Sequence, residues 1–165
     1  MKALLRLIDR VSPPETVHAH CDIPCGIYDP HLAQVAALSV IRMNQLIEAL
    51  EPPAMEKAAR DKYMHALARY TATKDHHAEL VKHEVRIIRG DFFKPDNSPD
   101  NLGEIVDGIM KTASAARQNI DMEAAQKLLG LVNDFAAAFW KAKNVETKKV
   151  SSNQAAGGEY VVPAN

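Results

Sequence analysis

Hydrophobic residues recur at intervals of three or four along most of this sequence, which is the spacing of an amphipathic α-helix. In the most regular segment the apolar positions are Leu128, Leu131, Val132, Phe135 and Phe139. The same pattern, interrupted by short stretches rich in proline, asparagine and aspartate, predicts four helices over residues 30–50, 54–90, 100–117 and 122–144.

Local residues mark the ends of these helices. Asp29 can cap the first helix, with Pro30 at its first position, and Asp121 can cap the fourth. We expect residues 91–99 to form a loop between the second and third helices. Residues 145–165 lose the helical period and contain paired serines and paired glycines, so they are predicted to form a disordered, mobile tail.

Four helices with short connections favour an all-α fold, an antiparallel up-down four-helix bundle formed by residues 31–144. The second predicted helix is the longest. At 1.5 Å per residue, about 36 residues span roughly 54 Å, against roughly 30 Å for the first helix. The first half of the second helix must therefore extend beyond the bundle, bend, or contact another subunit.

Composition excludes several classes of protein. The chain has 165 residues, 47% of them hydrophobic, and a formal net charge of −1. This length suits one soluble domain, and the absence of excess positive charge argues against nucleic-acid binding. No stretch approaches the ~20 apolar residues of a membrane span, and two cysteines make no secreted disulfide framework.

The first nineteen residues, 1–19, differ from the rest. Arg6 and Asp9 interrupt a short apolar run, and Pro13 and Pro14 end it. A secretory signal needs an uninterrupted apolar core of about 7–15 residues. We therefore expect a short amphipathic piece followed by an extended linker, with no general export signal.

Candidate chemistry is concentrated in residues 20–30, HCDIPCGIYDP, which we call the hook. Pro24 and Gly26 flank Cys25 and favour a tight turn. The three residues between Cys21 and Cys25 fit neither a zinc knuckle nor a CxxC redox pair. Composition alone favours two structural thiols in a loop.

A different chemistry becomes available if the chain is cut between Ala19 and His20. The new α-amine, together with the amide nitrogen and thiolate of Cys21, can then form two fused five-membered chelate rings, and Cys25 can add a second thiolate. A planar set of two nitrogens and two sulfurs favours Ni(II) or Cu(II). Anionic donors also stabilise a higher oxidation state, so nickel there can cycle between Ni(II) and Ni(III), whereas zinc has no redox chemistry.

The hook resembles the nickel-binding motif of the nickel superoxide dismutases, and later parts of the chain resemble the family in the same order. These later landmarks are Ala78–Glu79–Leu80, Lys82–His83, Asp91–Phe92–Phe93–Lys94–Pro95 and Phe139–Trp140. The resemblance covers about residues 20–144. It implies an oxidoreductase that disproportionates superoxide to dioxygen and hydrogen peroxide, with one nickel ion per subunit.

The resemblance also implies how the enzyme is made. The sequence as it stands is then an unprocessed precursor, a proprotein whose leader, residues 1–19, is removed between Ala19 and His20 by a dedicated peptidase. The mature subunit is expected to assemble into a homo-hexamer in the cytoplasm. While the bond between these two residues is intact, the nitrogen of His20 is an amide and a poor metal donor.

By the same resemblance the metal ligands are three residues. His20 contributes its α-amine, and its imidazole as the axial ligand of the oxidised metal. Cys21 contributes its amide nitrogen and thiolate, and Cys25 contributes the second thiolate.

Four further residues are implied around the metal. Pro24 shapes the hook, and Asp22 and Tyr28 surround it. Tyr28 is expected to be catalytic, with its hydroxyl ordering water or substrate over the open face of the metal. Lys94 either adds positive potential for an anionic substrate or is an ordinary surface lysine.

Three positions depart from the usual pattern of the family. Ala36 stands where a glutamate usually steadies the axial imidazole, and His77 stands where an arginine follows in that network. Phe92 replaces the second tyrosine near the hook. The orientation of the His20 ring is therefore open, and one hypothesis is that His77 interacts with it directly or through water.

The same residue types also permit metal binding of a different kind. A noncatalytic helical bundle that stores or senses nickel or copper can use the same hook. His18 and His20 beside the cysteines can form a zinc or copper site in the uncut chain, although the ligands would be crowded. His76 and His83 share one face of the second predicted helix, but they have no obvious partner ligand.

Overall fold

The computed structural model describes residues 26–164. Its helices are α2 (His31–Glu48), α3 (Lys57–Ile87), α4 (Leu102–Gln118) and α5 (Met122–Ala142). A π-helical turn, η1 (Ile88–Phe92), continues α3. The leader and the first part of the hook, up to Cys25, lie outside the described residues.

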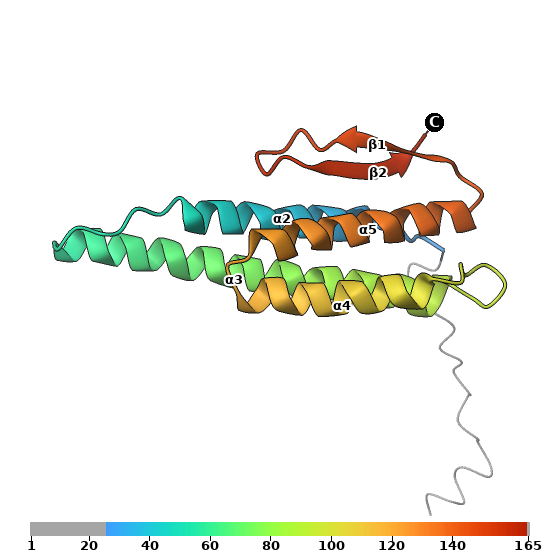
Figure 1. The fold of residues 1–165 in the computed structure, drawn as a ribbon, viewed down its shortest axis with the longest axis horizontal. Coiled ribbons are helices and arrows are strands. Elements are labelled where there is room, and N and C mark those ends of the chain that lie inside the picture. Colours follow the sequence, from blue (N-terminus) through green and yellow to red (C-terminus); the bar gives the residue numbers. More distant parts are fainter. Residues whose placement is uncertain (1–25, 165) are drawn as a thin grey trace, which may run out of the picture.

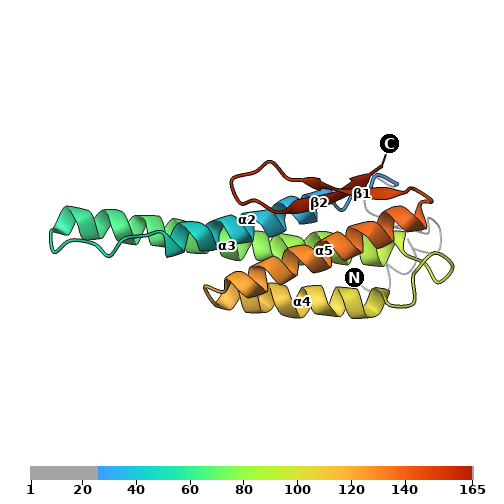
Figure 2. The ribbon, with the colours of Figure 1, turned by 45° about the horizontal axis from the view of Figure 1, so that its top comes forward.

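The four helices run up and down in alternation and form the predicted antiparallel bundle (Figures 1 and 2). On α5, fully buried Leu128, Val132, Phe135 and Phe139 follow one another at intervals of four, three and four, so one stripe of the helix faces the core. Asp121 caps this helix as expected, since its carboxylate accepts a hydrogen bond of 2.9 Å from the backbone N–H of Ala124.

Small side chains bring α2 and α3 close together. The buried face of α2 includes Ala33 and Ala37, and α3 presents Ala78, Val81 and Val85, all with no exposed surface. Small side chains such as alanine and valine let two helix backbones approach closely while still filling the space between them. Within residues 26–164, no helix is both long enough and apolar enough to cross a bilayer.

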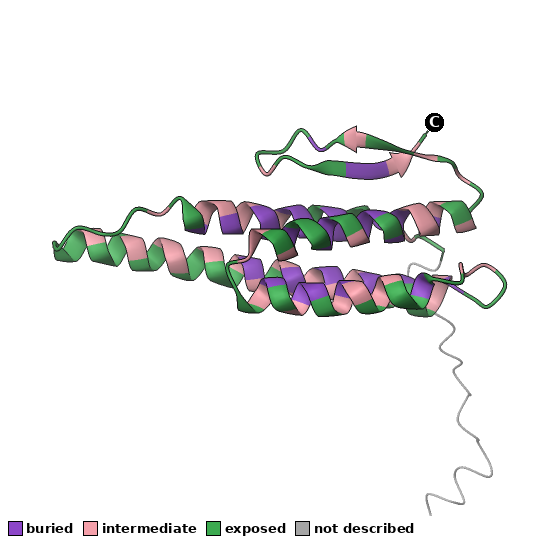
Figure 3. Ribbon diagram, in the orientation of Figure 1, coloured by how far each residue is buried: buried purple, intermediate pink, exposed green. Residues whose placement is uncertain are grey.

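The first half of α3 extends beyond the bundle, which is one of the outcomes expected from its length (Figure 1). Figure 3 shows this projecting half as exposed or half-buried, whereas buried positions begin where α3 passes the other helices. Lys74 marks that point, because it is 2% exposed and its ammonium donates to the backbone oxygen of Asn119 at the end of α4. Burial lowers the pKa of Lys74.

Ion pairs on the surface connect α3 to α4. Arg117 donates to both carboxylate oxygens of Asp75, at 2.6 and 3.1 Å, and to Glu79 at 2.9 Å. Arg86 donates to the other oxygen of Glu79, and this hydrogen bond is the main reason that the pKa of Glu79 is lowered. These groups are largely exposed, so we expect them to orient the helices more than they stabilise the fold.

The prediction of a disordered tail is wrong for most of residues 145–165. Strands β1 (Thr147–Ser151) and β2 (Glu159–Pro163) form an antiparallel hairpin in which Thr147 pairs with Pro163 and Ser151 with Glu159. The hairpin lies on the side of the bundle formed by α2 and α5 (Figures 1 and 2). The fold is thus a four-helix bundle with one small sheet added, not purely helical.

The hairpin packs closely on the bundle through one glycine. Gly158 has a φ of +80°, a conformation that side chains disfavour. A Cβ atom at this position would lie 3.0 Å from methyl groups of both Leu38 and Leu129. Glycine is therefore required both by the backbone and by the close approach to α2 and α5.

Candidate metal centre

Aromatic side chains gather at the end of the bundle where α2 begins and where η1 and α5 end. The Tyr28 ring lies 6.4 Å from the ring of Phe92, which in turn lies 4.5 Å from that of Phe139, measured between centroids. Phe93 and Trp140 adjoin them at 5.1 and 5.0 Å. We call these five residues the end cluster. The described chain passes this cluster at Tyr28 before it enters α2.

Local sequence explains how Tyr28 reaches this cluster. Gly26 has a φ of +82°, so the chain turns there in a way that few other residues permit. Asp29 then accepts a 2.8 Å hydrogen bond from the backbone N–H of His31, and Pro30 is buried at the start of α2. The N-cap of α2 is Pro30 and has no side-chain cap, so the prediction that Asp29 caps this helix is wrong, although Asp29 does bond to its first residue.

Phe92 and Phe93 pack as the sequence suggested, although they lie on a π-helical turn and just after it. Phe93 is 3% exposed and contacts Phe135 at 5.8 Å, whereas Phe92 is half-buried and faces Tyr28. Phe92 is the last residue of η1 and Phe93 follows in extended backbone, so the two rings point in different directions. The ring of Phe93 therefore enters the core, whereas the ring of Phe92 packs against Tyr28. We call Tyr28 to His31, the residues that connect the hook to α2, the base of the hook.

One cation at this end was missed by sequence reasoning. The Lys143 ammonium lies 5.2 Å from the Phe139 ring centroid and 5.5 Å from that of Trp140. The spacing of three residues from Trp140 to Lys143 on a helix was the available clue. Lys94 lies two residues after Phe92, with its side chain exposed and its backbone N–H bonded to Asn97 at 2.6 Å.

The remaining predicted residues fall into two groups. Ala19, His20, Cys21, Asp22, Pro24 and Cys25 lie outside the described residues. Ala36 is 1% exposed in the core face of α2, so no polar group stands at that position. His77 is half-buried on α3, fifteen positions before Phe92, which corresponds to roughly 22 Å along the helix.

The hydrogen bond of His77 fixes its tautomer. Its Nδ1 atom lies 2.8 Å from the backbone oxygen of Thr73, and a carbonyl oxygen only accepts, so Nδ1 carries the proton. When the ring is neutral, Nε2 is therefore the acceptor.

The donor chemistry of the chain fits nickel at the hook. Within residues 26–164, no group of three or more histidine, cysteine, aspartate or glutamate side chains is placed to hold a metal ion. The only two cysteines of the chain, Cys21 and Cys25, both come shortly before Gly26. Thiolates with nitrogen donors in a planar set suit nickel, whereas oxygen donors would suit magnesium or calcium.

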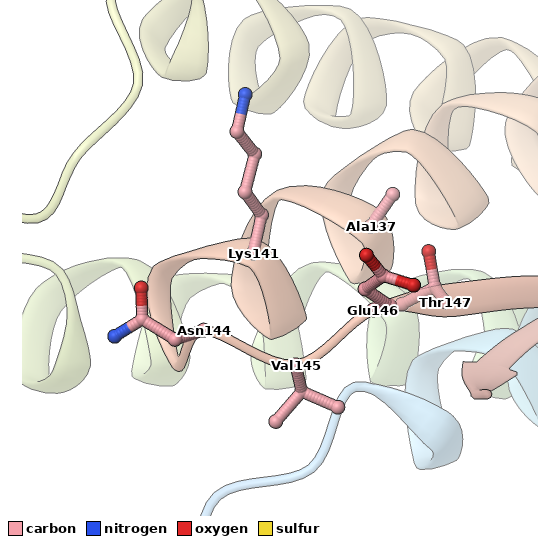
Figure 4. A pocket seen from close by; sticks show the side chains of 6 residues that line it. All are labelled: Ala137, Lys141, Asn144, Val145, Glu146 and Thr147. Carbon is pink, nitrogen blue, oxygen red and sulfur yellow. The ribbon is translucent and has the colours of Figure 1, made fainter. Parts of the chain in front are cut away.

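A surface pocket lies near the same end but has a different character. It has a volume of about 540 Å³ between the last turn of α5 and the start of β1. Figure 4 shows that the side chain of Asn144 points away from those of Glu146 and Thr147, so its polar groups do not converge on one point. None of the predicted site residues lines this pocket.

Comparison with known proteins identifies the helical part of the chain. Residues 15–143 match the model of the nickel-containing superoxide dismutase family. The superoxide dismutase [Ni] of Streptomyces coelicolor is 36% identical over 135 residues, covering 80% of this chain and 94% of that protein. The superoxide dismutase [Ni] of Streptomyces seoulensis is 35% identical over 134 residues, with the same coverage.

Solved structures agree with this match. The native structure of a nickel superoxide dismutase aligns with a TM-score of 0.64 and 32% identity, covering 75% of this chain and 99% of that one. A crystal structure with nickel ligation of the oxidised state aligns with a TM-score of 0.65 and 32% identity, covering 76% and 99%. The match in sequence reaches across the hook and the whole bundle, and the fold is the same. The chain therefore belongs to the nickel-containing superoxide dismutase family.

Proposed function

We propose that this chain disproportionates superoxide to dioxygen and hydrogen peroxide at a nickel centre formed by His20, Cys21 and Cys25. The observation that carries the proposal is the pair of cysteines, Cys21 and Cys25, shortly before Tyr28. Both lie within the family match, which begins at residue 15. Two superoxide ions and two protons give one dioxygen and one hydrogen peroxide, so one substrate molecule is oxidised and the other is reduced.

Each donor of the hook has a specific task. Removal of residues 1–19 converts the nitrogen of His20 from an amide into an amine, which is a good donor once it is deprotonated. Cys21 would supply its amide nitrogen and thiolate, Cys25 would supply a second thiolate, and the His20 imidazole would add a further nitrogen donor. When bound in such a set, nickel supplies a one-electron couple between Ni(II) and Ni(III). In this proposal Pro24 shapes the hook, and Asp22 lies near the metal without binding it.

The end cluster and its lysines complete the site. The role proposed for Tyr28 is to order water or substrate beside the metal through its hydroxyl, and its packing against Phe92 supports that role. Superoxide is an anion, so the positive charges of Lys94 and Lys143 at this end favour its approach. Reduction of the second superoxide to hydrogen peroxide consumes the two protons, which ordered water near Tyr28 can deliver.

His77 is proposed to orient the axial imidazole in place of the missing carboxylate. Its Nε2 acceptor can take the N–H of the His20 ring directly or through water, in the same subunit or from a neighbour. In the nickel-loaded chain that begins at His20, His77→Ala should weaken or remove the electron paramagnetic resonance signal of Ni(III). His83→Ala, which changes an exposed histidine of the same helix, is the control. An unchanged spectrum in His77→Ala would remove this role.

The maturation and assembly of the protein form part of the proposal. A dedicated peptidase cleaves between Ala19 and His20, and the mature chains form a homo-hexamer in the cytoplasm. The projecting half of α3, which has few neighbours within its own subunit, supports assembly through contacts with other copies. Light scattering of the mature protein measures the number of subunits, and a monomer at micromolar concentration would contradict this part.

The direct test compares three forms of the chain after exposure to Ni(II). The form beginning at His20 should bind one nickel per subunit and dismute superoxide. The form beginning at Met1 and the form beginning at Cys21 should show at most background turnover, because each lacks the amine of residue 20. A noncatalytic nickel store would instead bind one nickel in the first form without turnover, which would overturn the proposal.

A further inference from the structure

The C-terminal hairpin lies beyond the residues that match the family, and it returns to the base of the hook. The family match ends at residue 143, whereas the hairpin occupies residues 147–163. On β2, the Tyr160 ring contacts the ring of His31 edge to face, with centroids 4.8 Å apart and an interplanar angle of 69°. His31 is the first residue of α2, three positions after Tyr28.

Buried amides hold the hairpin in place on the bundle. Gln34 of α2 donates to the side-chain oxygen of Asn133 on α5 at 2.8 Å and to the backbone oxygen of Val161 on β2 at 3.0 Å. Asn133 donates to the backbone oxygen of Glu159 at 2.9 Å. Both amides are more than nine-tenths buried, so leaving either without its partner would cost free energy. The hairpin is therefore a fixed part of the fold.

The base of the hook is thus held by two ring contacts, one on each side of Asp29 and Pro30 in the sequence. On one side Tyr28 packs against Phe92, which rests on Phe139 of α5. On the other side His31 packs against Tyr160, and the hairpin that carries Tyr160 continues from the same α5. Along the chain the two contacts flank Asp29 and Pro30, so each limits the movement of one end of that turn.

We infer that the C-terminal hairpin fixes the position of the residues on which the hook is mounted, with Tyr160 as a positioning residue that acts through His31. The inference rests on the proposed function, because it concerns the geometry of the nickel centre. Tyr160 is assigned no contact of its own with metal or substrate. Its ring, 8% exposed, holds the first turn of α2.

Hydrogen exchange in the metal-free, full-length chain tests whether Tyr160 holds the first turn of α2. The backbone N–H of Gln34 bonds to the oxygen of Pro30 at 3.2 Å and so reports opening of the first turn of α2. In Tyr160→Ala this amide should exchange roughly two- to tenfold faster, the effect expected for a lost aromatic pair. Tyr160→Phe keeps the ring and should restore the slow rate. Amides in the middle of α4 serve as the internal reference.

Two further variants separate loss of this contact from general loosening. Val161→Ala truncates the neighbouring buried side chain but keeps the backbone oxygen that Gln34 uses, so exchange at Gln34 should stay near the wild-type rate. His31→Ala removes the same contact by truncating its exposed partner. It should raise the exchange rate at Gln34 as Tyr160→Ala does, and it serves as the test if Tyr160→Ala folds poorly. Equal exchange in His31→Ala and the wild type would overturn the inference.

A second readout connects the contact to the metal. In the nickel-loaded chain that begins at His20, Tyr160→Ala should broaden the Ni(III) resonance signal, whereas Tyr160→Phe and Val161→Ala should leave it sharp. A sharp signal in Tyr160→Ala would show that the hairpin does not position the hook, whatever the exchange rates. If no form of the chain dismutes superoxide, the proposed function fails, while the exchange result still decides whether the hairpin holds the base.

Discussion

Replacing Cys21 by serine in the chain that begins at His20 should abolish stoichiometric nickel binding and reduce superoxide turnover to background. A hydroxyl is a hard donor that stays protonated near neutral pH, whereas a thiolate is soft and anionic. The chain has only one other cysteine, Cys25, so no second thiolate pair can replace the lost one. Metal analysis after dialysis and a superoxide assay measure the two effects on the same sample.

A matched control separates loss of the thiolate from damage to the fold. Ile120→Ser introduces the same side chain at a 55% exposed position in the turn between α4 and α5, at the opposite end of the bundle. This variant should keep one nickel per subunit and full turnover. If Cys21→Ser kept either its nickel or its activity, the assignment of the thiolate ligands would be wrong.

Replacing Phe139 by alanine should destabilise the fold by about 3–5 kcal/mol, the usual range for a buried phenylalanine. Its side chain has no exposed surface, and it contacts Phe92, Trp140 and Lys143. Because Phe92 supports Tyr28, the variant should also lose much of its superoxide turnover under conditions in which it remains folded. Denaturant unfolding measures the first effect, and the activity of the folded, nickel-loaded chain measures the second.

Phe135→Ala is the matched control for this prediction. Phe135 is equally buried on the same helix, but its ring contacts Phe93, which points into the core. The free energy of unfolding should fall by a similar amount, while turnover of the folded protein should change much less. Equal losses of turnover in the two variants would mean that the contact of Phe139 with Phe92 has no special part in supporting the site.

The helices could be predicted because the residues that determine them lie close together in the sequence. Apolar residues at intervals of three and four define the core face of α5, and Asp121 caps it as its residue type suggested. The predicted bounds of the four helices differ from the observed ones by only a few residues at each end. The projecting half of α3 was one of three outcomes that its length allowed, because α3 is longer than its partners can cover.

The hairpin could not be predicted because its stability depends on distant residues. Residues 147–163 contain serine, lysine and glycine, and their composition resembles that of a mobile tail. They are ordered by amides that lie far away in the sequence: Gln34 precedes Val161 by 127 positions. No local pattern relates these positions, although Val161 and Val162 next to Tyr160 were a weak indication of a strand.

The candidate site also has a part that the local sequence predicts and a part that depends on distant residues. The hook was recognisable because its residue types and their spacing carry the chemistry themselves. The packing of Phe92 and Phe93 was expected, but the contact of Tyr28 with Phe92 depends on the turn at Gly26 and on η1. Lys143, by contrast, lies over two rings at the end of its own helix, so its spacing from Trp140 was a local clue.

The nickel centre at His20 is tested most sharply by the intact mass and metal content of the protein isolated from its own cells. We expect a chain that lacks residues 1–19, begins at His20, carries one nickel per subunit and dismutes superoxide. An active protein that still carries its leader, or one that holds zinc in place of nickel, would contradict the proposed centre.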